Sequence, residues 1–211
     1  MKLTKIRPRR WGVAVLVGGI LVLGGCTAPA TDKPTAASRT DKTGTAIISP
    51  AAAAAAQQAL QFYHTVTLDE TRAQVETTLG VAGEIQPDGQ VGYRNPDSGY
   101  GVLITYTQDD TVFAKRLLST ALAPELAALN PFPVTDKQAY RMAAGMPFYE
   151  VQDVMGSDGI EISLSRPEPC SPKQVTGLGW FNPDGSYAVV YLNLPTGEVI
   201  RSEFVPGSQP D

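Results

Sequence analysis

The sequence is poor in the side chains from which catalytic and metal sites are usually built. Its 211 residues include one histidine, His64, and two cysteines, Cys26 and Cys170. No serine or cysteine stands near His64 in a nucleophile-elbow pattern, and the scattered carboxylates lack the spacing of metal ligands. We therefore expect no catalytic residue, no metal and no cofactor, and we predict that the protein is not an enzyme.

The N-terminal residues have the pattern of a lipoprotein signal. Five basic residues within residues 2–10 precede an uncharged apolar run over residues 11–25, which ends in Leu-Gly-Gly-Cys at Cys26. The run is shorter than the roughly 20 residues of a comfortable transmembrane helix, although an N-terminal anchor helix stays open as an alternative. The pattern predicts a signal peptide over residues 1–25 and lipidation of Cys26. Such a protein is held at the cell membrane, on its extracytoplasmic face, by the lipid.

The remaining chain is acidic and has no internal disulfide. Removal of residues 1–25 takes away five of the 17 basic residues and none of the 21 acidic ones, leaving 12 against 21, a net charge of −9. An acidic chain without a basic patch is a poor partner for nucleic acid and for anionic lipid headgroups. Because Cys26 is modified, Cys170 has no partner within the chain. Cys170 is either an unreacted thiol or a residue with a redox or intermolecular role.

Composition divides the rest of the chain into segments. Residues 26–49 have few large apolar groups and are expected to form a flexible tether. Ser49 and Pro50 form a helix start, which predicts a helix from Pro50 to about His64. We assign a first unit to residues 50–118, a connector to residues 119–134, a second unit to residues 135–206 and a tail to residues 207–211.

The two units align with each other, which indicates a tandem duplication. Residues 67–80 match residues 143–156 at an offset of 76, and residues 93–104 match residues 180–191 at an offset of 87. Shared turn chemistry is the alternative explanation, but both matches occur in the same order. The difference between the offsets places an insertion within residues 166–176.

Each unit is expected to contain helices followed by strands. In the first unit Thr67 and Glu70 fit a capping box for a helix that ends at Gly80. Asn182-Pro183-Asp184-Gly185 is a turn sequence that predicts a hairpin. The predicted helices cover residues 119–129, 136–142 and 147–156, and the predicted strands cover residues 92–95, 99–106, 111–117, 179–182, 186–193 and 198–205.

The motifs of the second unit resemble those of a known superfamily. Gly145-Met146, the helix end at Met155-Gly156 and the Asn-Pro-Asp-Gly-Ser turn at residues 182–186 are similar to the β-lactamase inhibitor protein-like superfamily, which includes bacterial lipoproteins. A more distant similarity is to the small lipoprotein of the outer-membrane β-barrel assembly machinery. The match spans residues 136–204 and is weaker over residues 62–118, where Asp69-Glu70 replaces Gly-Met.

The resemblance implies an α+β fold of two tandem units, each a helix-loop-helix packed on an antiparallel sheet. It also implies that the other sheet face is a concave binding surface. The disulfides of the inhibitor cannot form in this chain, and its contact residues cannot be carried over one by one.

Alternation along the strands sorts the side chains between the two sheet faces. The resemblance implies that the side with Trp180 and Leu192 faces the helices, so the tyrosines on the other, open face would offer rigid contact area with a polar tip. The alternative is that these side chains pack against the other unit or a loop. The predicted partner-binding residues are Arg94, Tyr100, Tyr106, Phe181, Tyr187 and Tyr191.

These expectations favour a lipid-anchored, extracytoplasmic protein-binding module that uses its concave aromatic sheet face. Two alternatives remain open. One is an accessory lipoprotein of an envelope assembly complex, and the other is an inhibitor of a secreted or envelope enzyme such as a β-lactamase-like protein.

Overall fold

The computed structural model describes residues 49–118, 123–130, 132–168 and 171–207, and contacts place all of them in the unit Ala37–Asp211. The predicted signal peptide, Cys26, most of the tether and Cys170 lie outside the described residues. Among the helices of the described part, none is long and apolar enough to cross a membrane.

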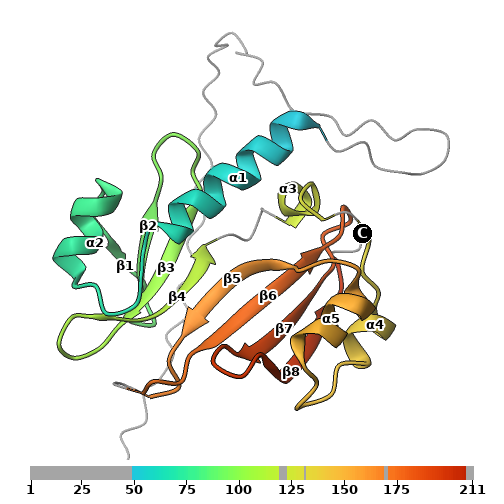
Figure 1. The fold of residues 1–211 in the computed structure, drawn as a ribbon. Coiled ribbons are helices and arrows are strands. Elements are labelled where there is room, and N and C mark those ends of the chain that lie inside the picture. Colours follow the sequence, from blue (N-terminus) through green and yellow to red (C-terminus); the bar gives the residue numbers. More distant parts are fainter. Residues whose placement is uncertain (1–48, 119–122, 131, 169–170, 208–211) are drawn as a thin grey trace, which may run out of the picture. The chain divides into compact units, whose positions relative to one another are not determined.

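Helix α1, Pro50–His64, begins at the predicted residue (Figure 1). The Ser49 hydroxyl accepts a hydrogen bond from the backbone N–H of Ala52 at 3.1 Å. This bond satisfies one of the first N–H groups of the helix, which have no partner within it. Pro50 occupies the first helical turn, where its missing N–H is not needed.

Helix α2, Arg72–Leu79, begins later than predicted because a different capping box is used. Thr71 and Gln74 cap each other reciprocally. The Glu70 carboxylate accepts a hydrogen bond from the backbone N–H of Thr67, at 3.1 Å, outside the helix. The predicted end is confirmed, since Gly80 caps α2 with a left-handed φ of 68°.

Three shorter helices follow: α3 (Ala123–Ala127), α4 (Asp136–Tyr140) and α5 (Phe148–Met155). Helix α4 starts at the predicted residue, with a Thr135–Gln138 capping box. Helix α5 ends as predicted at Gly156, whose φ is 77°.

Eight strands form one antiparallel sheet in chain order. They are β1 (Glu84–Ile85), β2 (Val91–Arg94), β3 (Gly101–Tyr106), β4 (Val112–Leu118), β5 (Ile160–Ser165), β6 (Val175–Phe181), β7 (Tyr187–Asn193) and β8 (Glu198–Val205). The predicted strands correspond to β2, β3, β4, β6, β7 and β8, whereas β1 and β5 were not predicted. Strands β4 and β5 pair through residues such as Lys115 and Leu164. Residues of both predicted units therefore belong to one continuous sheet.

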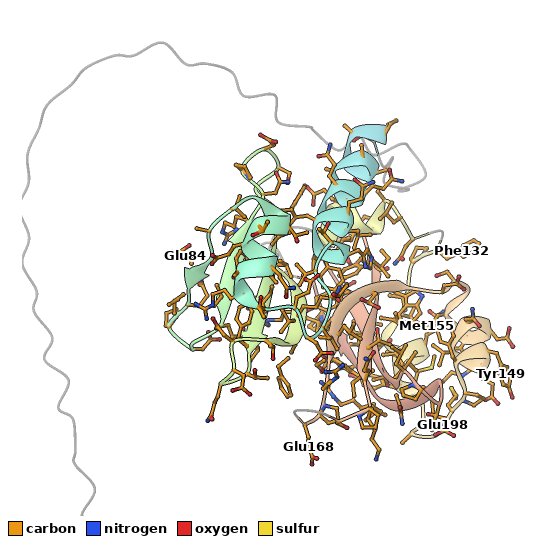
Figure 2. All side chains as sticks on the ribbon, turned by 60° about the vertical axis from the view of Figure 1, so that its left-hand side comes forward. Glu84, Phe132, Tyr149, Met155, Glu168 and Glu198 are labelled. Atoms are coloured by element: carbon orange, nitrogen blue, oxygen red, sulfur yellow. The ribbon has the colours of Figure 1, made fainter. Side chains whose placement is uncertain are left out.

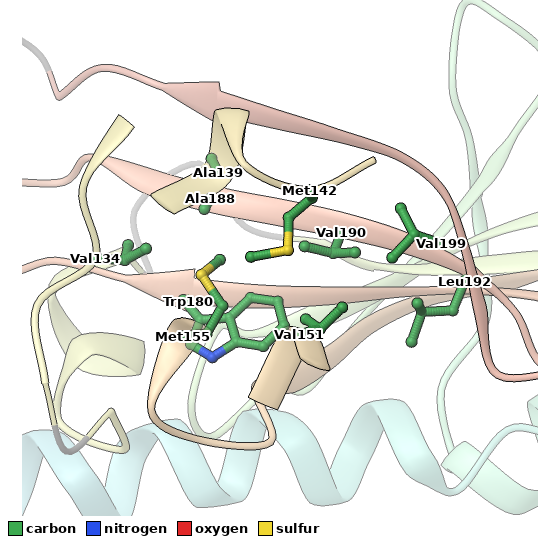
Figure 3. Packing of buried hydrophobic residues seen from close by; sticks show 10 residues of the cluster. All are labelled: Val134, Ala139, Met142, Val151, Met155, Trp180, Ala188, Val190, Leu192 and Val199. Carbon is green, nitrogen blue, oxygen red and sulfur yellow. The ribbon is translucent and has the colours of Figure 1, made fainter. Parts of the chain in front are cut away.

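We call residues 50–118 the first half of the fold and residues 135–206 the second half. The core of the second half lies between β6–β8 and helices α4 and α5 (Figure 3). Trp180 is fully buried at its centre, and its indole N–H donates to the hydroxyl of Ser157 at 3.0 Å. Val151 and Met155 of α5 pack against it. The predicted core position of Trp180 is confirmed.

The core of the first half lies between β2–β4, helix α2 and the end of α1. Phe62 and Tyr63 of α1 and Val75 of α2 pack there against Tyr93 and Ile104. Helix α1 also joins a third cluster, described below, so one helix contributes to two packed clusters.

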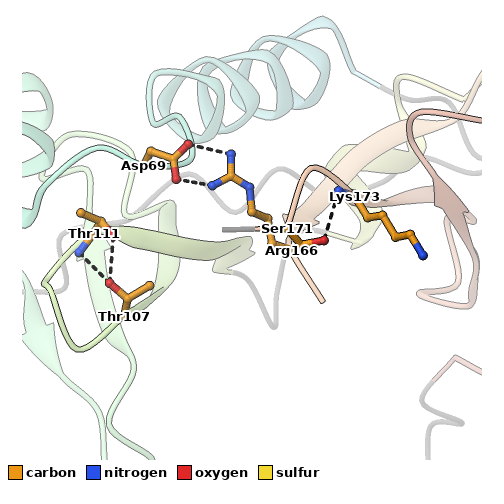
Figure 4. Close-up of polar contacts among 6 residues, drawn as sticks. All are labelled: Asp69, Thr107, Thr111, Arg166, Ser171 and Lys173. Atoms are coloured by element: carbon orange, nitrogen blue, oxygen red, sulfur yellow. Dashed lines mark hydrogen bonds and ion pairs between the residues drawn. The ribbon is translucent and has the colours of Figure 1, made fainter. Parts of the chain in front are cut away.

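An ion pair joins the loop before α2 to the end of β5 (Figure 4). The Arg166 guanidinium donates to both carboxylate oxygens of Asp69, with Nη2 2.6 Å from Oδ2. Asp69 has a left-handed φ of 71°, a conformation that aspartate and asparagine tolerate better than most residues.

Candidate binding surface

The second-half strands present the sheet faces that alternation predicts. Ala188, Val190 and Leu192 lie with Trp180 in the helix-covered core. We call this side of the sheet the Trp180 face and the opposite side the Tyr191 face. Since directly paired residues share a face, the pairs Phe181↔Tyr187 and Gly177↔Tyr191 lie on the Tyr191 face.

Helices α1 and α3 cover one end of the Tyr191 face, which was expected to be open. Phe181 is only 6% exposed and packs with Ala56 and Ala59 of α1 and Leu126 of α3. The Tyr187 ring stacks on Phe181 with centroids 5.3 Å apart and is half-buried. These two predicted binding residues are therefore packed beneath helices, as the alternative interpretation allowed.

Tyr106 lies on the Trp180 face, so its predicted face is wrong. It packs against the first-half core, and its hydroxyl is 2.8 Å from that of Tyr93. The difference arises from the lengths of the β2–β3 and β6–β7 turns. Tyr93 pairs with Val102, nine residues later in the chain, whereas Trp180 pairs with Ala188, eight residues later. One extra residue in the first turn moves every later side chain to the opposite face.

Arg94 and Tyr100 lie far from Tyr191. Arg94 is exposed at the end of β2, and its Nη1 is 3.5 Å from the carbonyl oxygen of Gly99. Tyr100 is half-buried in the turn and packs against the α1–α3 cluster. Strands are spaced about 4.8 Å apart, so β2 and β7, five positions apart in the sheet, are separated by about 24 Å. The structure does not bring the six predicted residues into one site.

Tyr191 is held in place by three neighbours. Its ring lies over Gly177, where an added Cβ would be 3.3 Å from the ring. The Arg201 guanidinium stacks on the ring at 3.7 Å from its centroid, and the Tyr191 hydroxyl donates to Glu203 at 3.1 Å. Arg201 also pairs with Glu203 at 2.8 Å. The aromatic side chain is therefore fixed before any partner arrives.

The Tyr191 hydroxyl and the Arg201 guanidinium are both protonated at neutral pH, and their surroundings raise the pKa of each. Burial, followed by the charge of Glu203, raises the pKa of the Tyr191 hydroxyl. Desolvation has the largest single effect on the pKa of Arg201 and lowers it, but the hydrogen bond to Glu203 and the charges of Tyr191 and Glu203 together raise this pKa overall. The surface thus offers an aromatic ring with a hydrogen-bond donor beside a guanidinium and a carboxylate.

A row of paired residues extends from Tyr191 across the sheet. Arg201 pairs with Tyr191, Tyr191 with Gly177, Gly177 with Ser163, and Ser163 with Arg116. We define the Tyr191 surface as Arg116, Ser163, Tyr191, Arg201 and Glu203. Arg116 is exposed at the far end of the row and donates to Gln90 at 3.2 Å.

Tyr191 is the one residue of this surface among the predicted partner-binding residues. Gly177 and Gly179 alternate with larger residues before Trp180, and a Cβ at Gly179 would approach the Phe181 ring to 2.7 Å. Alternating glycines in a strand signal that other groups lie directly on the backbone. That signal could have located the row beneath Tyr191.

The main buried polar cluster lies between the two halves and was also missed. Lys115 is 5% exposed, and its Nζ donates to the carbonyl oxygens of Val66 at 2.7 Å and Tyr63 at 3.3 Å. The Tyr63 hydroxyl donates to Glu161 of β5 at 3.0 Å. Burial lowers the pKa of Lys115, and the charge of Glu161 opposes that shift. Each polar group is committed to a partner, which favours a structural role.

The only histidine stands beside this cluster on the surface. The exposed His64 ring contacts Tyr63 edge-on at 5.0 Å. Partial burial is the main reason that its pKa is lowered. No group of three or more metal-ligating side chains occurs among the described residues.

Comparison with protein families found no matching family model, and no curated protein is significantly similar to the chain.

Proposed function

We propose that the chain is a lipid-anchored, extracytoplasmic binding protein, without catalytic activity, that recognises a protein partner through the Tyr191 surface. The observation that carries the proposal is the immobilised Tyr191 ring, stacked by Arg201 and hydrogen-bonded to Glu203. Tyrosine and arginine are common anchors of protein interfaces, and a side chain fixed in advance loses little entropy on binding.

The lipid anchor rests on the sequence around Cys26, which lies outside the described residues. The basic segment, the apolar run and the Leu-Gly-Gly-Cys ending support it. A lipid at Cys26 would hold residues 50–207 at the membrane surface through the intervening chain.

We further propose that residues 50–118 and 135–206 are two tandem, related units, each with a helix-loop-helix on its part of the sheet. Supporting this, each of these ranges supplies two helices and then strands, and α2 and α5 both end at a left-handed glycine. Tyr93 and Trp180, at matching positions of the alignment, are both fully buried. The continuous sheet is also compatible with a single undivided unit.

The test is capture of membrane proteins by the anchored full chain in its host, with variants compared quantitatively. Tyr191→Ala and Arg201→Ala are expected to weaken capture of a specific partner, each by about 1–2 kcal/mol. Tyr149→Ala is the matched control, because Tyr149 is a 62% exposed tyrosine on α5 (Figure 2). Equal loss with Tyr149→Ala, or no loss with either surface variant, would reject the Tyr191 surface as the binding site.

The identity of the captured protein separates the functional alternatives. A stoichiometric integral-membrane protein would favour an accessory lipoprotein of an envelope assembly complex. A secreted or envelope enzyme whose activity falls on binding would favour an inhibitor.

A further inference from the structure

Strand β8 is an edge strand whose outer side is only partly covered. At its start, Val199 exchanges backbone hydrogen bonds with Gly145 and Met146, at 2.8 and 2.9 Å. Beyond Val199, the only strand paired with β8 in the described part of the chain is β7. The stretch from Arg201 to Val205 therefore has an open outer edge.

The register identifies which backbone groups point outward on this edge. The Gly197 N–H donates to the carbonyl oxygen of Asn193, so the backbone groups of Asn193 point toward β8. Because this direction alternates along an antiparallel strand, the backbone groups of Tyr191 and Val189 also point toward β8. Their partners on β8 therefore direct their backbone N–H and C=O groups toward β7. The residues between these partners direct theirs toward the outer edge. Ser202 and Phe204, which pair with Val190 and Ala188, consequently have outward-pointing N–H and C=O groups without a backbone partner among the described residues.

A pocket of about 470 Å³ adjoins this edge at Phe204. Its other walls include Asp136 and Tyr140 from the start and end of α4, and Asp184 from the β6–β7 turn. Neither lysine nor arginine lines it. Tyr140 is 71% exposed, so most of its aromatic ring is open to solvent beside the pocket.

The two carboxylates each use one oxygen within the chain. Asp136 Oδ1 accepts the backbone N–H of Lys137 at 2.7 Å, and Asp184 Oδ1 accepts from both the N–H and the hydroxyl of Ser186. None of the salt bridges within the described residues involves Asp136 or Asp184. Both carboxylates are therefore able to receive an external cation.

We propose that the outer edge of β8 binds an extended segment of a protein partner, and that the adjoining pocket takes a lysine or arginine side chain of that segment. A strand added to β8 would exchange hydrogen bonds with Ser202 and Phe204. The residue directly opposite Phe204 shares its sheet face, so its side chain points into the pocket. There Asp136 and Asp184 match its charge, and the Tyr140 ring offers a cation–π contact. This site uses the backbone groups of Ser202 and Phe204 and the adjoining pocket, whereas the Tyr191 surface uses the side chains of Arg201 and Glu203 on the same strand.

The test uses the full chain in detergent micelles, labelled with ¹⁵N, and the acetylated, amidated peptide Thr-Val-Lys-Val-Thr as the probe. We expect the amide signals of Ser202 and Phe204 to shift and to become protected from exchange. Replacing the central lysine of the peptide by glutamate should weaken binding about tenfold or more. Methylating the backbone nitrogen of that lysine should abolish binding, because it removes the donor to the Phe204 carbonyl.

Variants of the protein test the pocket without disturbing its turn. The double variant Asp136→Asn/Asp184→Asn keeps the acceptor oxygens for Lys137 and Ser186 but removes both charges. It should reduce the preference for lysine over glutamate, whereas Asp109→Asn, in the exposed β3–β4 turn, should not.

Several outcomes would overturn the proposal. They are no binding at millimolar peptide, equal binding of the lysine and glutamate peptides, an N-methylated peptide that binds as well, and signal shifts that spare Ser202 and Phe204. Protection of these two amides without peptide, together with a dimer in sedimentation, would show that a second copy of the chain occupies the edge instead.

Discussion

The ammonium group of Lys115 lies 4.1 Å from the ring centroid of Tyr63, so a buried cation of β4 stacks on an aromatic side chain at the end of α1. The same ring carries the hydroxyl that donates to Glu161 of β5. Tyr63 thus connects the helix, the first-half strands and the second-half strands. This arrangement fixes α1 where its alanines can cover Phe181.

Removing the Tyr63 hydroxyl should destabilise the fold. A hydrogen bond to a charged group contributes about 1.5–3 kcal/mol, so Tyr63→Phe is expected to lower the free energy of unfolding by about that amount. Urea denaturation of the full chain measures the change. Tyr149→Phe is the control, since the Tyr149 hydroxyl donates to the neighbouring Glu150 in an exposed hydrogen bond of 3.3 Å. Equal effects of the two variants would mean that the Tyr63–Glu161 bond contributes little.

Truncating Trp180 should cost far more stability than truncating Tyr191. Trp180→Ala removes a fully buried aromatic side chain and is expected to cost about 3–5 kcal/mol. Tyr191→Ala removes a half-buried ring from the sheet surface and should leave the fold intact. Tyr187→Ala is expected to cost an intermediate amount of stability, because Tyr187 packs on Phe181 beneath α1 and α3. Thermal melting ranks the three variants. If Tyr191→Ala melts as low as Trp180→Ala, Tyr191 belongs to the core.

These differences show what the sequence can and cannot predict for this chain. Caps, turns and alternation are local, so α1, the ends of α2 and α5 and the β6–β7 hairpin could be predicted. The alternation of Ile160–Ser165 is also local and could have predicted β5, although no strand was predicted there. The sheet face on which Tyr106 lies depends on one extra residue in the β2–β3 turn. An alignment of the two units at a constant offset does not reveal this residue.

The covered end of the Tyr191 face depends on long-range packing. Ala56 and Ala59 are fully buried against Phe181, yet nothing in the alanine-rich sequence of residues 51–59 marks which methyl groups are buried. Lys115 gave no signal either, because its partners are backbone carbonyl groups about 50 residues earlier in the chain. Only the three-dimensional arrangement identifies Arg201, Glu203 and Arg116 as neighbours of Tyr191 in one row.

The ion pair between Asp69 and Arg166 should make the free energy of unfolding depend on pH in the acidic range. Its hydrogen bonds with Arg166 hold its pKa below the usual value of 3.8. A carboxyl group with a lowered pKa in the folded state stabilises the protein fully above its unfolded pKa, and the contribution is lost as the pH falls through the folded pKa. Asp69→Asn should thus be less stable at neutral pH and lose less stability on acidification below pH 3.8.

Asparagine is the right replacement for this test, because it tolerates the left-handed backbone at Asp69. Urea denaturation at a series of acidic pH values measures the effect. Asp88→Asn is the control, since Asp88 is an exposed turn carboxylate outside any ion pair of the described residues. Parallel stability curves for Asp69→Asn and the unmodified chain would contradict the prediction.

Lipidation should depend on Cys26. Cys26→Ala removes the thiol that would be acylated, so the protein is expected to remain unprocessed or to leave the membrane fraction. Metabolic labelling with a fatty-acid analogue and membrane fractionation measure these outcomes. Cys170→Ala is the control and should keep the label. An unmodified chain that takes up no label would refute the anchor.

The position of the Tyr191 ring should depend on the absence of a side chain at Gly177. A Cβ at Gly177 would lie 2.3 Å from the Ser163 hydroxyl oxygen and 3.3 Å from the Tyr191 ring. Gly177→Ala should therefore displace both neighbours, reduce stability by about 1–3 kcal/mol as an overpacked site, and weaken partner capture. Ser163→Ala alone removes an oxygen from a half-buried surface position and should have little effect on stability.

Combining the two changes separates their causes. Ser163→Ala removes the closest contact of the new methyl group, so the double variant Gly177→Ala/Ser163→Ala should recover much of the lost stability. It should recover less of the binding, because the contact with the Tyr191 ring remains. A double-mutant cycle of urea denaturation and capture yields measures both couplings. Strictly additive losses of stability would show that the Ser163 hydroxyl does not limit the space above Gly177. Full recovery of binding would show that Arg201 and Glu203 alone determine the position of the Tyr191 ring.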